Sequence, residues 1–177
     1  MLYDLAIDEE LEKMDEDAAL KAWSAQEIQI SLKELMRPIV TIDISCSTNE
    51  AIDLLLAHKI GAAPVVENGT LCGIFSERDV LNKILNKQVG DLDVIGVEEF
   101  MIAAPQTAQQ EDSLNIAILY MAQGGYRHLP IVDSGNRPIG MVSIRDVISY
   151  LVEEFPQEVL TLPPRPVRDA LKAREGA

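Results

Sequence analysis

An octet that the chain spells twice constrains its fold more than any other feature of the sequence. GIFSERDV (73–80) and GMVSIRDV (140–147) share the Gly, the Ser, the Arg-Asp pair and the final Val. The likeness continues upstream in four further pairs of segments: LKELM (32–36) with VEEFM (97–101), Thr41 with Thr107, STNEAI (47–52) with SLNIAI (113–118), and GAAPVV (61–66) with RHLPIV (127–132). An internal repeat of this length predicts two copies of one small folding unit.

Each copy contains a segment with the pattern of an amphipathic helix. In the first copy Ala51, Ile52 and Leu55 recur at helical spacing after Ser47, which is a good N-cap residue. The second copy repeats the pattern from about Ser113. The sequence therefore predicts one helix at the same place in both units.

Two strands and a second helix follow in each copy. In the first copy the apolar runs 63–66 and 71–75 flank Asn68-Gly69, a strong hairpin signal. In the second copy the runs 129–132 and 139–142 flank a polar turn, and each octet leads into a last helix. With a short strand before the first helix, the order is β-α-β-β-α, twice. Neither copy alone covers both faces of its sheet, so we expect an α+β fold in which the two copies pack together.

The repeat leaves a flank at each end of the chain. Residues 1–30 hold nine acidic residues and two Lys, with apolar residues at helical spacing, which predicts an acidic helical extension. The tail after Phe155 is rich in Pro and then mildly basic. We therefore divide the chain into four parts: the acidic extension (1–31), the first copy (32–90), the second copy (91–155) and the tail (156–177).

The charge and the cysteines limit the partners of the protein. The net charge of −14 argues against binding to a nucleic-acid backbone, because that affinity comes from clustered Lys and Arg. Only Cys46 and Cys72 are present, without the spacing of a disulfide framework or a zinc site. No apolar run approaches the ~20 residues of a membrane helix, and the N-terminus lacks the pattern of a signal peptide. We expect no membrane association and a cytoplasmic location.

The doubled octet has a structural explanation that comes first. Ser76 with Asp79, and Ser143 with Asp146, have the spacing of a capping box with Asp in place of Glu. Capping alone would account for both pairs, and the Gly that opens each octet is explained by turn chemistry. However, a helix that starts at the end of a buried strand also presents free amides and the positive end of its dipole, which favour an anion.

Cations stand close to both helix starts in this acidic chain. Arg78 and Arg145 are next to the two Asp residues in the sequence. Lys59 lies just before a strand of the first copy, and Arg127 and His128 lie just before the matching strand of the second. A carboxylate in such a setting can accept hydrogen bonds from both hydroxyls of a ribose, while the Ser hydroxyl and backbone amides hold a phosphate. The pattern therefore also fits a site for a phosphorylated nucleoside.

The ordered pattern of each copy resembles a known family. Each copy reads hydrophobic-x-x-hydrophobic-Met, then Thr, then Ser-x-x-x-Ala, then Pro-Val/Ile-Val, then Gly-x-x-Ser-x-Arg-Asp. Over residues 32–155 this resembles a tandem pair of CBS domains, the module first described in cystathionine β-synthase and also called a Bateman module. The resemblance implies that the two β-α-β-β-α copies pack by pseudo-twofold symmetry. It also implies two clefts between them, which in many relatives bind adenosine-containing ligands.

The resemblance implies a set of ligand-binding residues. Asp79 and Asp146 would bind the ribose hydroxyls of the two clefts, with Ser76 and Ser143 near phosphate. The cleft at Asp146 would also draw on Ala51, Ile60, Gly61, Ala62 and Arg145, with Arg127 as a phosphate contact. The cleft at Asp79 would also draw on Arg78, Ala117, Tyr126, Arg127 and His128.

The two clefts are not expected to be equal. Arg127 and His128 in the second copy stand where the first copy has Gly61 and Ala62, so the basic side chains come mostly from one copy. We expect the clefts to differ in affinity. A metal site at His58 or His128 is disfavoured, because neither has partners at ligand spacing.

These inferences describe a regulatory module rather than an enzyme, because no nucleophile and base pair and no P-loop is present. The flanks are too short for an attached enzyme, so a stand-alone pair without a required cofactor is expected. The first hypothesis is a cytoplasmic homodimer that senses AMP or ADP, with ATP competing, and signals to an unknown client protein by a conformational or oligomeric change. Two alternatives stay open: a ligand-free dimeric scaffold, or a sensor of S-adenosylmethionine, a cyclic dinucleotide or NAD.

Overall fold

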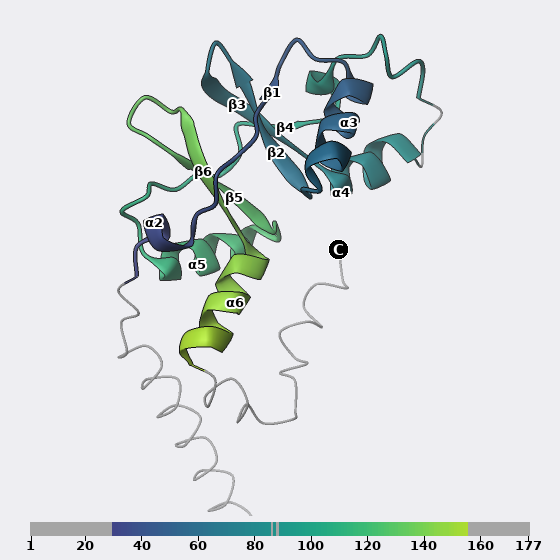
Figure 1. Cartoon of the computed structure of the whole chain (residues 1–177). Coiled ribbons are helices and arrows are strands. Elements are labelled where there is room, and N and C mark those ends of the chain that lie inside the picture. The colour runs from purple at the N-terminus through teal and green to yellow at the C-terminus, as the bar shows by residue number, and fades with distance from the viewer. Residues whose placement is uncertain (1–29, 86, 88, 156–177) are drawn as a thin grey trace, which may run out of the picture.

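The computed structural model describes residues 30–85, 87 and 89–155 (Figure 1). Residues 1–29 of the predicted acidic extension and the whole predicted tail lie outside these residues. Figure 1 shows two units, each with a small sheet and helices beside it. None of the helices described by the structure is long and apolar enough to cross a membrane.

The first copy is built on a four-stranded sheet of order β1-β2-β3-β4, in which β1 runs parallel to β2 and the other pairs are antiparallel. Its strands are β1 (Ile42–Asp43), β2 (Ala62–Glu67), β3 (Thr70–Ser76) and β4 (Ile102–Ala103). Its helices are α3 (Thr48–His58) and α4 (Glu77–Asp79), which continues as the π-helix η1 (Val80–Leu85). The predicted hairpin is confirmed: Asn68 and Gly69 both have positive φ, 51° and 79°, as its tight turn requires.

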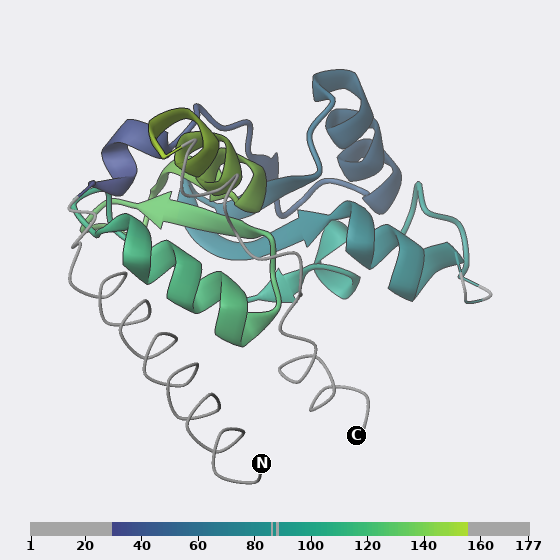
Figure 2. The same ribbon diagram turned by 90° about the horizontal axis from the view of Figure 1, so that it is seen from below.

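The second copy repeats the scheme with less sheet. It contains β5 (His128–Val132) and β6 (Pro138–Ser143), which pair antiparallel, and α5 (Leu114–Gly124) and α6 (Ile144–Glu154). The two helices lie beside each other on one face of the hairpin (Figure 2). The predicted first strand is reduced to one parallel bridge between Ala108 and Ile131. Arg37 bridges Met141 at the other edge, as β4 pairs with β3 in the first copy.

The segments that lead into the two copies exchange places. The helix α2 (Leu32–Leu35) precedes the first copy, yet Leu32 and Leu35 are buried in the core of the second copy, and Figure 1 shows α2 beside that copy. The 3₁₀ helix η2 (Val97–Glu99) precedes the second copy, yet Val97 is buried in the core of the first. The core of each copy is therefore completed by the lead segment of the other copy.

This exchange explains the Gly that opens each octet. Gly73 and Gly140 lie inside β3 and β6, so their assignment to turns is wrong. A Cβ at Gly73 would lie 2.3 Å from the Sδ of Met101, and a Cβ at Gly140 would lie 2.8 Å from the Sδ of Met36. The Gly of the octet and the Met of the lead segment form one packing contact, because only a missing side chain lets the Met lie against the strand.

The two copies meet through a small apolar cluster. Ala62 and Ile74 of the first copy pack with Met141 of the second and with Ile39. The predicted packing of the two copies against each other, in an α+β fold with pseudo-twofold symmetry, is confirmed.

Candidate functional site

Two clefts lie between the copies, one on each side of this cluster. The first cleft has a volume of about 320 Å³ and the second about 540 Å³, both in the range of small-molecule sites. The first is lined by Gly61, Ala62, Ile74, Ser76, Glu77, Arg78, Leu81, Ile102, Ala104, Pro105, Gln106, Tyr126, Arg127 and His128. The second is lined by Arg37, Ile39, Val40, Lys59, Ile60, Gly61, Ala62, Glu77, Arg127, His128, Met141, Ser143, Ile144, Arg145 and Asp146.

The wall between the clefts is made of the loops that precede β2 and β5. Gly61 and His128 line both clefts, and a Cβ added at Gly61 would lie 3.3 Å from the Cε1 of His128. The sequence predicted that Gly61 and Ala62 line only the cleft at Asp146 and that His128 lines only the cleft at Asp79. In the structure these residues line both clefts. Burial lowers the pKa of His128 below its ordinary 6.5, which outweighs the opposing charge of Glu77.

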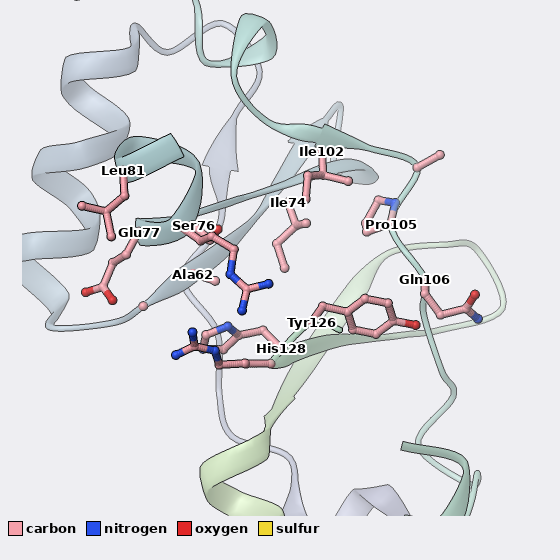
Figure 3. Close-up of a pocket in the computed structure, with 14 residues that line it drawn as sticks. Ala62, Ile74, Ser76, Glu77, Leu81, Ile102, Pro105, Gln106, Tyr126 and His128 are labelled. Atoms are coloured by element: carbon pink, nitrogen blue, oxygen red, sulfur yellow. The ribbon is translucent and has the colours of Figure 1, made fainter. Parts of the chain in front are cut away.

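The first cleft has apolar walls. Figure 3 shows Ile74 and Ile102 on one side, facing Tyr126 and His128 on the other. Arg78 reaches across it, because its Nη1 donates to the carbonyl oxygen of Gly125 at 2.8 Å. One of the two cations of this cleft is therefore held by a contact between the copies.

Asp79 does not line the first cleft. It is 4% exposed, and its Oδ2 accepts hydrogen bonds from the amide and the hydroxyl of Ser76 at 3.0 and 2.6 Å. Its Oδ1 pairs with the Nζ of Lys83 at 2.9 Å. Lys83 also donates to the carbonyl oxygen of Phe100 at 2.6 Å. Both oxygens of Asp79 thus have partners inside the first copy.

Asp146 has the same cap and a different second partner. Its Oδ2 accepts from the amide and the hydroxyl of Ser143 at 2.9 and 2.6 Å, and its Oδ1 accepts from the Nε of Arg37. Arg37 comes from the segment before β1, and its side chain is 69% exposed. Burial opposes ionisation of Asp146, but the hydrogen bonds from Ser143 and Arg37 outweigh it, so its pKa lies below 3.8.

The second cleft concentrates positive charge. Four cationic side chains line it, against two carboxylates: Arg37, Lys59, Arg127 and Arg145, with Glu77 and Asp146. The first cleft has two, Arg78 and Arg127, against Glu77. The helix starts differ as well, since the residue after the N-cap is Glu77 in α4 and Ile144 in α6. An anion at the start of α6 therefore lies near more cations than an anion at the start of α4, and it meets no acidic side chain in the first position of the helix.

Eleven of the fourteen predicted site residues line at least one cleft, and three do not. Ala51 and Ala117 are buried in the cores of the two copies, and Asp79 is sealed by Ser76 and Lys83. Ala51 and Ala117 do not line a cleft because α3 and α5 turn them into the cores.

Sequence reasoning missed the two segments that close the clefts. Residues 37, 39 and 40 line the second cleft, and residues 102, 104, 105 and 106 line the first. Each segment follows the matched Met of a lead segment, Met36 or Met101. The matched Met residues were the available signal, because equivalent positions in a repeat occupy equivalent places.

Among the described residues, no three His, Cys, Asp or Glu gather in a way that could hold a metal ion. The two cysteines are free thiols.

Comparison with known proteins identifies the repeat. The family model of the CBS domain matches residues 32–86 and again 97–153. The CBS domain-containing protein YhcV of Bacillus subtilis is 33% identical over 133 residues, covering 74% of this chain and 93% of that protein.

Solved structures give the same fold. The CBS-domain containing protein ATU1752 from Agrobacterium tumefaciens is 32% identical, with a TM-score of 0.62 over 68% of this chain and 98% of that chain. The CBS domain pair of protein MJ0100, solved with 5-methylthioadenosine and S-adenosylmethionine, is 27% identical, with a TM-score of 0.61 over 69% and 98%.

Some relatives are enzymes, but the match covers only part of them. It spans 20% of a homoserine O-acetyltransferase of Methanocorpusculum labreanum, at 34% identity over 58% of this chain. It spans 23% of an inosine-5'-monophosphate dehydrogenase of Methanocaldococcus jannaschii, at 29% identity over 70% of this chain. With the doubled octet, the paired clefts and the two family matches in place, the chain belongs to the CBS domain family and carries two CBS domains in tandem.

Proposed function

We propose that the protein is a regulatory module that binds a phosphorylated adenosine ligand in the second cleft, AMP or ADP with ATP competing. Occupancy of the cleft then changes the arrangement of the two copies and passes a signal to a partner protein. The observation that carries the proposal is the lining of the second cleft, where Asp146 stands at the start of α6 among four cations.

The adenosine part is supported by the family. A CBS domain pair with the same fold, MJ0100, was solved with two adenosine derivatives. In the second cleft, the carboxylate of Asp146 is the group suited to accept both ribose hydroxyls. The ribose would replace Arg37 at Oδ1, because Arg37 occupies that oxygen in this structure.

The phosphate part is supported by charge. A cationic sulfonium ligand such as S-adenosylmethionine gains nothing from Arg37, Lys59, Arg127 and Arg145, whereas each phosphate charge is attracted by all four. We therefore place AMP and ADP ahead of S-adenosylmethionine. NAD and cyclic dinucleotides carry phosphates as well, and they are arms of the test.

A homodimer is the assembly that we propose for signalling. Five large apolar side chains on helices are 46% to 68% exposed: Leu56 on α3, Leu81 and Leu85 on η1, and Ile148 and Val152 on α6. A second copy of the chain would cover them. The cytoplasmic location and the client protein stay predictions of the sequence.

The test is a calorimetric titration of the full chain with AMP, ADP, ATP, NAD, S-adenosylmethionine and a cyclic dinucleotide. We expect AMP or ADP to bind with the highest affinity, and we expect Asp146→Asn to weaken this binding by about ten- to a hundredfold, the cost of a lost hydrogen bond to a charged group. Tightest binding of S-adenosylmethionine would overturn the phosphate argument. No binding of any ligand by folded protein would favour the dimeric scaffold.

A further inference from the structure

We propose that Lys83 closes the first cleft to the ribose of a nucleoside, so that each chain binds one adenosine ligand. The inference rests on the proposed function, because it uses the same carboxylate chemistry. It adds a residue that determines which of the two clefts is competent.

The contacts of Lys83 carry the argument. Its Nζ lies 2.9 Å from Asp79 Oδ1, and it donates to the backbone carbonyl oxygens of Phe100 and Met101 at 2.6 and 3.3 Å. The ammonium is therefore anchored by three acceptors, which is the full donor capacity of a Lys. A ribose that sought Asp79 would have to break this set of contacts.

The carboxylate of Asp79 is buried, as is that of Asp146 at 8% exposed, but only Asp146 lines its cleft. Asp79 is 4% exposed and does not line the first cleft, and its other oxygen is held by Ser76. A ribose hydroxyl in the first cleft thus finds no free oxygen on Asp79, and displacing the paired Lys83 would leave a charge without its partner.

The matched residue of the second copy shows that this closure is specific to one side. In the alignment of the octets, Lys83 corresponds to Tyr150, whose ring packs edge to face against Phe155. The second partner of Asp146 is instead Arg37, a 69% exposed side chain. The first carboxylate is closed by its own helix, whereas the second is covered by a side chain that solvent and ligand can reach.

The test counts bound AMP by calorimetry in the full chain. The wild type is expected to bind one AMP per chain, insensitive to Asp79→Asn. Lys83→Met is expected to bind a second AMP, with an affinity for the first cleft raised at least about tenfold. This second site should survive Asp146→Asn. Lys83→Arg, which keeps the charge, is the matched control and should keep one site.

Two results would overturn the inference: two AMP per wild-type chain, or one AMP in Lys83→Met that is folded by near-ultraviolet circular dichroism. The wild-type count decides the first result even if Lys83→Met does not fold. If the wild type binds no AMP but Lys83→Met with Asp146→Asn binds one, the inference holds and the proposed site in the second cleft fails.

Discussion

Asp79 and Asp146 occupy the same place in two copies of one octet and make the same capping box, yet they face different surroundings. Asp79 is closed off by Lys83 from its own helix, and Asp146 lies on the wall of a cleft with Arg37 as its second partner. The local sequence determines the cap. Residues outside the octet determine whether the carboxylate can also serve a ligand.

The two carboxylates should therefore rank in opposite order in two experiments. Asp146→Asn should weaken AMP binding by about ten- to a hundredfold, while Asp79→Asn should leave it unchanged. In urea unfolding, Asp79→Asn should cost about 1–3 kcal/mol, because it removes a buried partner of Lys83, and Asp146→Asn should cost less, because Arg37 stays solvated. The same rank order in both experiments would contradict the comparison.

Arg37 gives the second prediction. Because it occupies the oxygen that the ribose needs, it competes with unphosphorylated adenosine, whereas a phosphate offers it a new partner. Arg37→Gln should tighten adenosine and weaken AMP, lowering the preference for AMP by about tenfold, the equivalent of one charge-assisted hydrogen bond. Titration with both ligands measures this ratio. Arg137→Gln, exposed and outside both clefts, is the matched control, and an unchanged ratio in Arg37→Gln would rule out the competition.

Glu77 gives a smaller effect. It lines both clefts and stands where the second copy has Ile144, so it repels an anion at either helix start. Glu77→Gln should raise AMP affinity by a factor of about five at low salt, or about 1 kcal/mol. The gain should shrink at ~1 M salt, where the Debye length is about 3 Å. Glu111→Gln, an exposed acid away from the clefts, should change nothing. A gain that does not respond to salt would exclude the electrostatic cause.

His128 gives the smallest effect, on stability. Burial lowers its pKa below 6.5 in the folded state, so the unfolded chain binds the proton more readily. The stability from the neutral imidazole is complete above pH 6.5 and falls as pH drops through that value toward the folded pKa. Asp146 contributes a separate loss only below pH 3.8, because its pKa is lowered too.

Urea unfolding over this range checks the effect of His128. His128→Gln should flatten the pH dependence near 6.5, and His58→Gln, an exposed histidine, should not. If the free energy of unfolding of His128→Gln still depends on pH near 6.5, another group is the cause.

The sequence predicted the local elements well and the long-range contacts poorly. The hairpin at Asn68 and Gly69 and the caps at Ser76 and Ser143 follow from neighbouring residues, and the structure confirms them. Arg37 lies 109 residues from Asp146, and no local pattern connects the two. The pairing of Asp79 with Lys83, four residues apart in a helical segment, was open to inspection in the sequence. It was missed because Asp79 was assigned to the cap and to the ribose hydroxyls, and Lys83 was not considered as its partner.

The exchanged lead segments have a mechanical consequence. Leu32 is buried in the core of the second copy and Val97 in the core of the first. If the chain is cut between the two copies, each copy therefore loses a segment that fills its core. A change in the angle between the copies also displaces the lead segments, whose side chains are buried in the two cores. A small molecule that widens one cleft would thus change the core packing of both copies through the lead segments alone.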